Sequence, residues 1–282
     1  IKEAKNKNMS YRVLNNTFIS DEFDDFTEQF NSMMEHIENE KITELISVIK
    51  KLMPEEKIES SGFNFVSYYK PSKEIGGDFI DVFDINENKK AIVIADVVGK
   101  SFPAAFLMVL GMTSIKLLSK KFSYPPEFIF ELNRFLRVNT PPGKWITMIY
   151  SILDTKTGEI EILNCGHPEA FIFSQNKITE FSSTFPMIGE LSDEKFKKYI
   201  DDYKSSHTTK FKLAAGDLFF LYTDGLSDSV NNEKNYFNIK SSVDQSFKSD
   251  YSAEKLKNKI IEQLTEFSVK DDLTFLLITK QN

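Results

Sequence analysis

The stretch Glu74–Lys100, EIGGDFIDVFDINENKKAIVIADVVGK, sets the organisation of the rest of the chain. Its residues Phe79–Ile85 are rich in aromatic and β-branched types, and Ala91–Ala95 are all apolar, so each run predicts a strand. The polar residues 86–89 between the two runs are typical of a turn. Together the three segments predict an antiparallel hairpin.

This hairpin predicts that two carboxylates meet at its open edge. If the turn is centred near residues 87–88, antiparallel pairing places Asp78 opposite about residue 97. Asp78 and Asp96 then lie close together. Two adjacent carboxylates repel each other unless a proton or a cation lies between them. The pair is therefore the first candidate for a functional site.

Composition narrows the classes of function. The chain has 282 residues, 41% of them hydrophobic, which is enough for one large domain with an appendage. The net charge of −7 argues against a nucleic-acid partner. The single cysteine, Cys165, excludes an internal disulfide and favours a reducing, cytoplasmic location. With only three histidines, a metal is expected to be held by oxygen ligands and to be Mg²⁺ or Mn²⁺.

The N-terminal part predicts helices. Residues 20–37 carry apolar positions at helical spacing after the N-cap residue Ser20. The segments Met9–Val13, MSYRV, and Asp21–Ile37, DEFDDFTEQFNSMMEHI, resemble the end of a HAMP module, the signal-relay unit that follows membrane spans in receptors. This resemblance implies a partial HAMP-like signalling segment over residues 1–38. It also implies that the chain is the cytoplasmic portion of a longer, membrane-anchored parent.

Residues 39–55 predict a helical linker that ends at Pro54. An apolar seam near heptad spacing runs along it and consists of Ile42, Leu45, Ile46, Ile49 and Leu52. The seam fits either a helix packed on the next domain or a parallel coiled coil between two copies. We favour the coiled coil, so a homodimer through the N-terminal helices is expected. The sequence shows no apolar run long enough to span a membrane and no signal peptide, so no membrane contact by this chain is expected.

Residues 56–282 predict one domain in which strands are interrupted by helices. A helix with Pro103 in its first turn is expected to bury a stripe formed by Phe106, Val109, Leu110, Thr113 and Leu117. A second helix, Pro125–Val138, is expected to turn Phe135 inward with its other apolar residues. Further strands are predicted at Trp145–Leu153, Glu159–Asn164, Ala170–Ser174, Ile178–Phe181, Leu218–Tyr222 and Leu273–Thr279, and a long helix at Ser252–Phe267. This order lacks βαβ alternation and therefore predicts an α+β fold of antiparallel sheets with helices outside them.

Four aspartates share one position in this pattern. Asp96 and Asp224 lie at the exits of apolar strands, whereas Asp78 and Asp271 lie at the entries of others. Because the exit of one antiparallel strand lies beside the entry of the next, all four can gather at one edge. A carboxylate cluster without matching Arg or Lys residues calls for divalent cations. Two cations roughly 3.5–4 Å apart can activate a water for phosphoryl transfer.

At these residues the chain resembles the metal-dependent protein serine/threonine phosphatases of the type 2C-like kind, in their bacterial SpoIIE/RsbU branch. The resemblance covers about residues 45–282. Its motifs, in order, are Gly76-Gly77-Asp78-Phe79, Ala95-Asp96-Val97-Val98-Gly99-Lys100, Asn164-Cys165-Gly166-His167-Pro168, Tyr222-Thr223-Asp224-Gly225 and Asp271-Asp272-Leu273-Thr274.

The resemblance implies a four-layer α/β/β/α sandwich with a pair of Mn²⁺ or Mg²⁺ ions between two sheets. It implies that Asp96 bridges both ions and that Val97 adds its backbone carbonyl. Asp78 would serve one ion, and Asp224 and Asp271 the other. Asp272 would be a neighbour that could exchange roles with Asp271. The implied substrate is a phosphoserine or phosphothreonine on a partner protein, typically an anti-sigma-factor antagonist in bacterial partner switching.

Three alternatives remain open from the residues. His167 could be a general acid to the leaving alkoxide, but a structural role in its Gly-His-Pro turn is favoured. Cys165 is expected to be a core residue rather than a nucleophile. The whole domain could also be a non-catalytic scaffold that binds a signalling partner, although the complete set of aspartates favours an enzyme.

Overall fold

The computed structural model describes residues 43, 46–99, 102–122, 124–174, 177–205, 210–247 and 252–281. The chain divides into two compact units, residues 1–51 and 52–282. The HAMP-like segment 1–38 lies outside the described residues. Of the predicted linker helix, residues 46–52 are helical.

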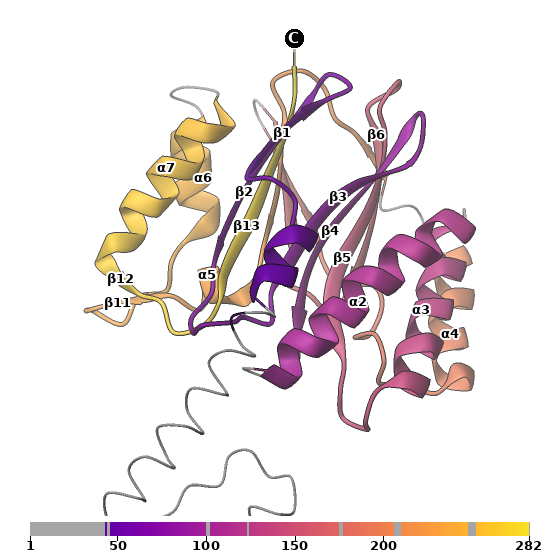
Figure 1. Ribbon diagram of the computed structural model, residues 1–282. Coiled ribbons are helices and arrows are strands. Elements are labelled where there is room, and N and C mark those ends of the chain that lie inside the picture. The colour runs from indigo at the N-terminus through magenta and orange to yellow at the C-terminus, as the bar shows by residue number, and fades with distance from the viewer. Residues whose placement is uncertain are drawn as a thin grey trace, which may run out of the picture. The chain divides into compact units, whose positions relative to one another are not determined.

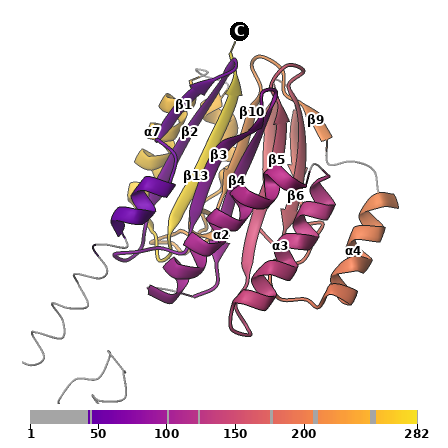
Figure 2. The ribbon, with the colours of Figure 1, turned by 45° about the vertical axis from the view of Figure 1, so that its right-hand side comes forward.

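The larger unit is built on two sheets whose strand pairs are all antiparallel (Figures 1 and 2). The first sheet has the order β1 (Lys57–Ser60), β2 (Phe63–Lys70), β13 (Leu273–Lys280), β10 (Leu218–Tyr222), β7 (Ala170–Ser174) and β8 (Lys177–Phe181). The second sheet has the order β3 (Phe79–Asn86), β4 (Lys89–Val97), β5 (Ile146–Asp154), β6 (Glu159–Cys165) and β9 (Lys210–Lys212).

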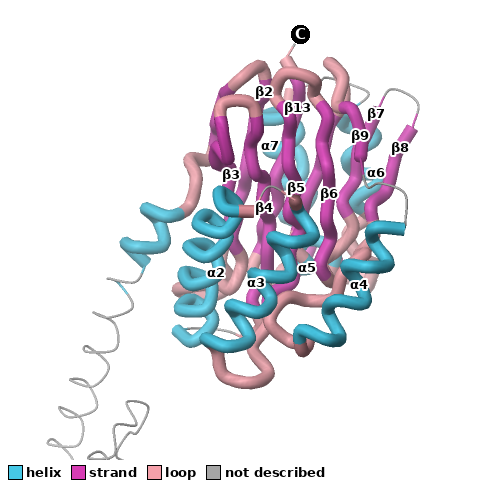
Figure 3. Tube along the Cα trace, turned by 90° about the vertical axis from the view of Figure 1, so that its right-hand side faces the viewer, coloured by secondary structure: helices cyan, strands magenta, loops and turns pink. Residues whose placement is uncertain are grey.

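Helices cover the outer face of each sheet (Figures 1 and 3). On the second sheet these are α2 (Phe102–Lys121), α3 (Pro125–Asn139) and α4 (Asp193–Ser205). On the first sheet they are α6 (Ile239–Phe247) and α7 (Ala253–Gln263). The result is the predicted α+β fold, with the layer order α/β/β/α.

The two core clusters explain why the sequences of several strands are apolar at every position. Phe219 and Leu221 of β10 belong to a cluster between the sheets, whereas Leu218, Phe220 and Tyr222 belong to a second cluster toward α6 and α7. Because successive side chains of a strand point to opposite faces, a strand covered on both sides must be apolar at every position. The predicted strand Leu218–Tyr222 has the observed bounds for this reason.

The opening hairpin forms as β3 and β4. Phe79 pairs with Ala95, so the register extended by one residue sets Asp78 opposite Asp96 rather than opposite residue 97. The one-residue difference arises from a bulge between Asp84 and Asn86 near the turn, which shifts the pairing. The two carboxylates at the open edge are therefore direct cross-strand neighbours, closer than pairing by reflection through the turn predicted.

Helix α2 corrects the sequence analysis, because the stripe expected to be buried is the outer face. Phe106 is 63% exposed and Leu117 is 68% exposed. The buried face holds Ala104, Ala105 and Gly111 together with the larger Met108, Met112 and Ile115. A Cβ on Gly111 would lie 2.7 Å from Cδ1 of Ile146, so the helix approaches the sheet closely at this position. Apolar residues occupy both faces, and periodicity alone did not distinguish them.

Helix α2 also corrects the expectation that no apolar run is long enough to span a membrane. Among the described residues, Pro103–Lys121 is long and apolar enough to cross a membrane by length and composition alone. Half of this window is buried within the fold, where α2 packs on β3, β4 and α3. A core helix passes the same test in this way. On α3, Phe135 was expected to point inward but is 37% exposed.

Smaller elements were missed or misjudged. The predicted helix 252–267 ends at Gln263, is followed by a 3-10 turn, η2 (Leu264–Glu266), and then by β12 (Phe267–Ser268). β12 pairs with β11 (Val230–Asn231), a tertiary contact that no local sequence pattern predicts. A short helix, α5 (Asp224–Ser227), starts at one of the candidate aspartates. Residues 190–210, for which no element was predicted, contain α4.

Candidate active site

The predicted aspartates come from both sheets and lie at one end of the sandwich. Asp78 precedes β3 and Asp96 is near the end of β4 in the second sheet. Asp224 follows β10, and Asp271 precedes β13, in the first sheet. β10 and β13 pair antiparallel, so the exit of one lies beside the entry of the other, as expected.

Electrostatics shows that these carboxylates are close enough to act on one another. Burial, together with the negative charges of Asp224, Asp271 and Asp272, raises the pKa of Asp96 to about 7. Burial and the charge of Asp96 raise the pKa of Asp78 well above its usual value. The neighbouring negative charges therefore disfavour ionisation of Asp78 and Asp96. The four predicted acids are brought together, two from each sheet.

The carboxylates do not form a closed ligand shell. Within the described part of the chain, no group of three or more His, Cys, Asp or Glu side chains is arranged so that it could hold a metal ion. The donor set still fits a hard divalent cation, since it consists of carboxylate oxygens, and neighbouring charge and burial raise the pKa of Asp78 and of Asp96.

One hydrogen bond joins the two halves of this acid cluster directly. The hydroxyl of Thr223, at the end of the first sheet's β10, donates to Oδ2 of Asp78 over 2.7 Å. Thr223 is fully buried, and Asp78 is 2% exposed. The backbone N–H of Thr223 also donates to the carbonyl of Thr274, over 3.0 Å. Thr223 therefore orients an acid of the opposite sheet while it is held in its own.

Asp272 has a different role from its neighbour Asp271. One carboxylate oxygen of Asp272 accepts the N–H of Ser72 over 2.7 Å, and the other accepts the N–H of Gly77 over 2.6 Å. Both oxygens thus hold the loop that leads to Asp78. The carboxylate of Asp271 accepts the backbone N–H of Asp272 over 3.0 Å. These contacts favour a loop-holding role for Asp272, and Asp271 stays the predicted ligand of the two.

Two glycines of the motifs permit these close approaches. A Cβ on Gly76 would lie 2.3 Å from Oδ2 of Asp272, and a Cβ on Gly225 would lie 1.9 Å from the carbonyl oxygen of Asp272. No side chain fits at either position without moving the loop. The Gly-Gly-Asp and Asp-Gly pairs are therefore needed to pack the three loops of the site together. Val97, the expected carbonyl ligand, ends β4, and its carbonyl oxygen faces Gly77.

His167 does not reach the acids. It is 5% exposed, its Nδ1 lies 2.9 Å from the hydroxyl of Thr147, and its Nε2 lies 3.1 Å from the carbonyl oxygen of Tyr222. Burial lowers the pKa of His167 to about 3, so the ring is neutral at pH 7. The general-acid alternative is therefore not supported, and the structural one is.

Cys165 is fully buried, and burial raises the pKa of its thiol, as expected for a core residue rather than a nucleophile. Sequence reasoning missed Thr223 and Thr147, which contact candidate residues through their hydroxyls. The signal for Thr223 was present: a hydroxyl between an apolar strand and an acid, inside a quoted motif. For Thr147 one signal was its place on a strand that pairs with β4.

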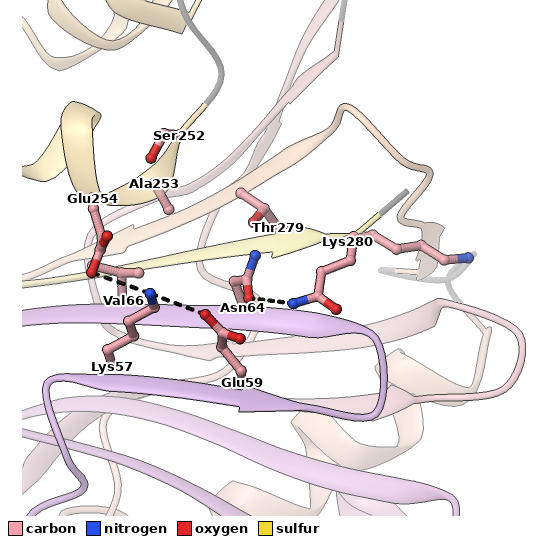
Figure 4. A pocket seen from close by; sticks show the side chains of 10 residues that line it. Lys57, Glu59, Asn64, Val66, Ser252, Ala253, Glu254, Thr279 and Lys280 are labelled. Atoms are coloured by element: carbon pink, nitrogen blue, oxygen red, sulfur yellow. Dashed lines mark hydrogen bonds and ion pairs between the residues drawn. The ribbon is translucent and has the colours of Figure 1, made fainter.

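A hollow lies at the end of the first sheet opposite the acids (Figure 4). It has a volume of about 270 Å³ and lies beside the start of β1, the end of β13 and the start of α7. Lys57 in it makes ion pairs with Glu59 at 3.0 Å and Glu254 at 3.4 Å. Asn64 accepts a hydrogen bond from Gln281 over 2.7 Å. These groups pair with one another, and the hollow is separated from the acids by the length of β13.

Comparisons with known proteins point to one family. The family model described as Stage II sporulation protein E (SpoIIE) matches residues 86–281. Phosphoserine phosphatase RsbU of Bacillus subtilis (strain 168) is 24% identical over 219 residues, which covers 75% of this chain and 61% of that protein. This chain therefore spans about three fifths of the length of that relative.

Solved structures share the fold. The SiaA-PP2C domain of Pseudomonas aeruginosa has a TM-score of 0.71 at 14% identity, over 88% of this chain and 98% of that one. RsbX in complex with magnesium has a TM-score of 0.58 at 17% identity, over 80% of this chain and 98% of that one. At such identities the likeness concerns the fold, whose layers are those described above.

Proposed function

Because this chain belongs to the family of Stage II sporulation protein E (SpoIIE), we propose that it is a divalent-metal-dependent phosphatase acting on a phosphorylated partner protein. The observation that supports the proposal is that acids from two sheets lie close together. Their charges, together with burial, raise the pKa of Asp96 to about 7. A buried carboxylate cluster of this kind is destabilising unless protons or cations neutralise it. Its retention in the core of the fold therefore argues for a bound cation.

The proposed ligands are the four aspartates and one carbonyl. Asp96 would contact two ions, Asp78 one of them, and Asp224 and Asp271 the other; the Val97 carbonyl would complete the set. Mn²⁺ or Mg²⁺ ions held there supply Lewis-acid activation of a water and neutralise charge on the phosphoryl group. A relative solved with magnesium supports this choice of hard cation.

The chain's own groups prepare the site in two ways. Thr223 fixes the orientation of the Asp78 carboxylate, and Asp272 fixes the loop from which Asp78 projects. Both contacts are buried, so the acids are held before a cation or substrate arrives. Preorganised charge of this type stabilises a developing transition state without reorganisation. The proposed reaction needs no covalent intermediate on a side chain.

The proposed substrate is a phosphoserine or phosphothreonine on a partner protein of the anti-sigma-factor-antagonist kind. The name of the relative, phosphoserine phosphatase RsbU, supports this class. A homodimer through the N-terminal helices and a cytoplasmic location remain part of the proposal, on the sequence patterns alone. The net charge of −7 agrees with a protein substrate rather than a nucleic acid.

The proposal is tested by hydrolysis of p-nitrophenyl phosphate and of a phosphoserine protein, with Mn²⁺ titrated into the metal-free chain. Asp96→Asn and Asp224→Asn are expected to abolish metal-dependent hydrolysis. Asp84→Asn is the matched control, because it lies in the same hairpin as Asp78 but its side chain is 69% exposed and pairs with Lys90. Hydrolysis that survives Asp96→Asn would contradict the proposed site. No hydrolysis with any divalent ion would favour the scaffold alternative.

A further inference from the structure

His167 lies on the link between the two sheets. It is part of residues 166–169, which connect β6 of the second sheet to β7 of the first. The turn is fixed from both sides by Asn164, whose Oδ1 accepts the His167 N–H over 2.9 Å and whose Nδ2 donates to the Pro168 carbonyl over 3.0 Å. The position of the imidazole is therefore set by its backbone as well as by its ring.

The partners of the ring determine its tautomer. The carbonyl oxygen of Tyr222 can only accept a hydrogen bond, so Nε2 of His167 must carry the proton. Nδ1 is then an acceptor, and the hydroxyl of Thr147 must donate to it. A charged ring could donate to both Thr147 and Tyr222, but burial of the ring disfavours its charge and lowers the pKa of His167 to about 3. Of the two neutral tautomers, the contacts therefore specify Nε2–H.

Both partners lead to the acid cluster. Thr147 is the direct cross-strand partner of Asp96 in the second sheet. Tyr222 is the last residue of β10 in the first sheet and is followed by Thr223 and Asp224. The ring of His167 thus spans from the strand beside Asp96 to the backbone that carries Asp224. Its two hydrogen bonds join the two halves of the cluster, as Thr223 and Asp78 do elsewhere.

We propose that His167 is a positioning residue that, as the neutral Nε2–H tautomer, holds the Asp224 segment at the correct distance from Asp96. The inference rests on the proposed metal cluster, since its measurable consequence is cation affinity. Residues that orient ligands from outside the ligand shell commonly change metal affinity about 10–100-fold when replaced. His167 acts here on the backbone next to a ligand, not on a ligand atom.

The tautomer is tested in the wild-type chain without any substitution. Long-range ¹H–¹⁵N correlation spectra identify which ring nitrogen is protonated, and the chain has only three histidines to resolve. The signal that disappears in His167→Gln belongs to His167. A neutral Nε2–H ring at pH 7 is expected. A neutral Nδ1–H ring, or a charged one, would overturn the proposal independently of any metal.

The positioning role is tested by Mn²⁺ titration calorimetry on two matched variants. The amide nitrogen of Gln in His167→Gln can take the place of Nε2 and donate to the Tyr222 carbonyl, whereas that of Asn in His167→Asn cannot reach it. His167→Asn is expected to weaken Mn²⁺ binding about 10–100-fold, and His167→Gln less than about threefold. Thermal unfolding in EDTA is measured in parallel.

The outcomes distinguish failure of the positioning role of His167 from failure of the proposed metal site. If both variants lower the melting temperature but bind Mn²⁺ as the wild type does, His167 is merely structural and the inference is wrong. Equal weakening by Asn and Gln would also contradict it, because the Nε2 donor would then be irrelevant. If the wild-type chain binds no Mn²⁺, the proposed metal site fails, and the inference fails with it.

Discussion

The hydroxyl of Thr223 donates a 2.7 Å hydrogen bond to Oδ2 of Asp78 and so joins the end of β10 to the start of β3. Thr223→Val keeps the shape of the side chain but removes this donor. A buried carboxylate that loses a donor is expected to cost about 1–3 kcal/mol in the free energy of unfolding. Thr223→Ser, which keeps the hydroxyl, is expected to cost less.

Urea unfolding of the metal-free chain at pH 7 measures both variants. The comparison between the wild type and Thr223→Val isolates the hydroxyl, because Val keeps the shape of this fully buried side chain, and Thr223→Ser measures the loss of the methyl group alone. If Thr223→Val is as stable as the wild type, the bond between the two sheets contributes nothing, and orientation of Asp78 must come from elsewhere.

Asp271 and Asp272 are adjacent but are expected to respond differently to the same substitution. Asp272→Asn replaces one of two carboxylate oxygens that accept the N–H groups of Ser72 and Gly77. An amide group then faces a backbone donor, and the free energy of unfolding is expected to fall by about 1.5–3 kcal/mol without metal. Asp271→Asn keeps an oxygen that can accept the Asp272 N–H, so its metal-free stability should change little.

Mn²⁺ affinity is expected to show the opposite order. Asp271→Asn removes a charged oxygen from the proposed ligand set and should weaken binding most. Calorimetric titration and urea unfolding on the same two proteins check both halves of this prediction. A variant of Asp272 that is fully stable but binds no Mn²⁺ would reverse the assignment of the two residues.

The parts of the site that follow from strand order were accessible from the sequence. Asp96 and Asp224 end apolar strands, and antiparallel pairing brings such ends beside the entries at Asp78 and Asp271. The contacts of Asp272 and Thr223 were not accessible, because each depends on a partner more than 100 residues away in the chain. Local pattern specifies which residues reach an edge, but not which of them touch.

Helix α2 shows the second limit of sequence reasoning. Its apolar residues extend over both faces, and the inward face is the one that brings Gly111 against Ile146. A stripe of large residues such as Phe106 and Leu117 is the stronger periodic signal, yet it is the exposed one. The buried face combines small residues with Met108, Met112 and Ile115, so the size of the residues does not predict which face is buried.

The exposure of these residues predicts that two substitutions on α2 lower stability by very different amounts. Met112→Ala removes a side chain that is 1% exposed and is expected to cost about 2–5 kcal/mol through lost burial and a cavity. Leu117→Ala removes one that is 68% exposed and should change stability by less than about 0.5 kcal/mol. Urea unfolding measures both. A larger loss for Leu117→Ala than for Met112→Ala would show that the helix packs with the face first expected from its sequence.

The raised pKa of Asp96 predicts that the metal-free chain becomes less stable as pH rises. In the folded state the group keeps its proton up to about pH 7, whereas in the unfolded chain it ionises near its ordinary pKa of about 3.9. The folded state therefore binds more protons between these values. The stability from Asp96 is fully present below about pH 4 and is lost as pH rises through about 7.

For one proton the free energy of unfolding falls by up to about 1.4 kcal/mol per pH unit within this window. His167 contributes with the opposite sign, because its lowered pKa makes stability fall as pH drops below about 6.5. Comparing the wild type with Asp96→Asn cancels that contribution, since both chains contain His167. The difference between the two unfolding curves, measured by urea in EDTA from pH 5 to 8, then reports Asp96 together with its effect on Asp78, whose pKa is raised by burial and by the charge of Asp96.

Mn²⁺ should reverse the trend for the wild type, because a cation binds the ionised cluster and competes with its protons. Stabilisation by a fixed Mn²⁺ concentration is therefore expected to increase from pH 5 to 8 in the wild type and to be much smaller in Asp96→Asn. A wild-type chain whose metal-free stability rises over this range as steeply as that of Asp96→Asn would show that Asp96 is ionised throughout. In that case the carboxylates would lie too far apart to need a shared proton or cation.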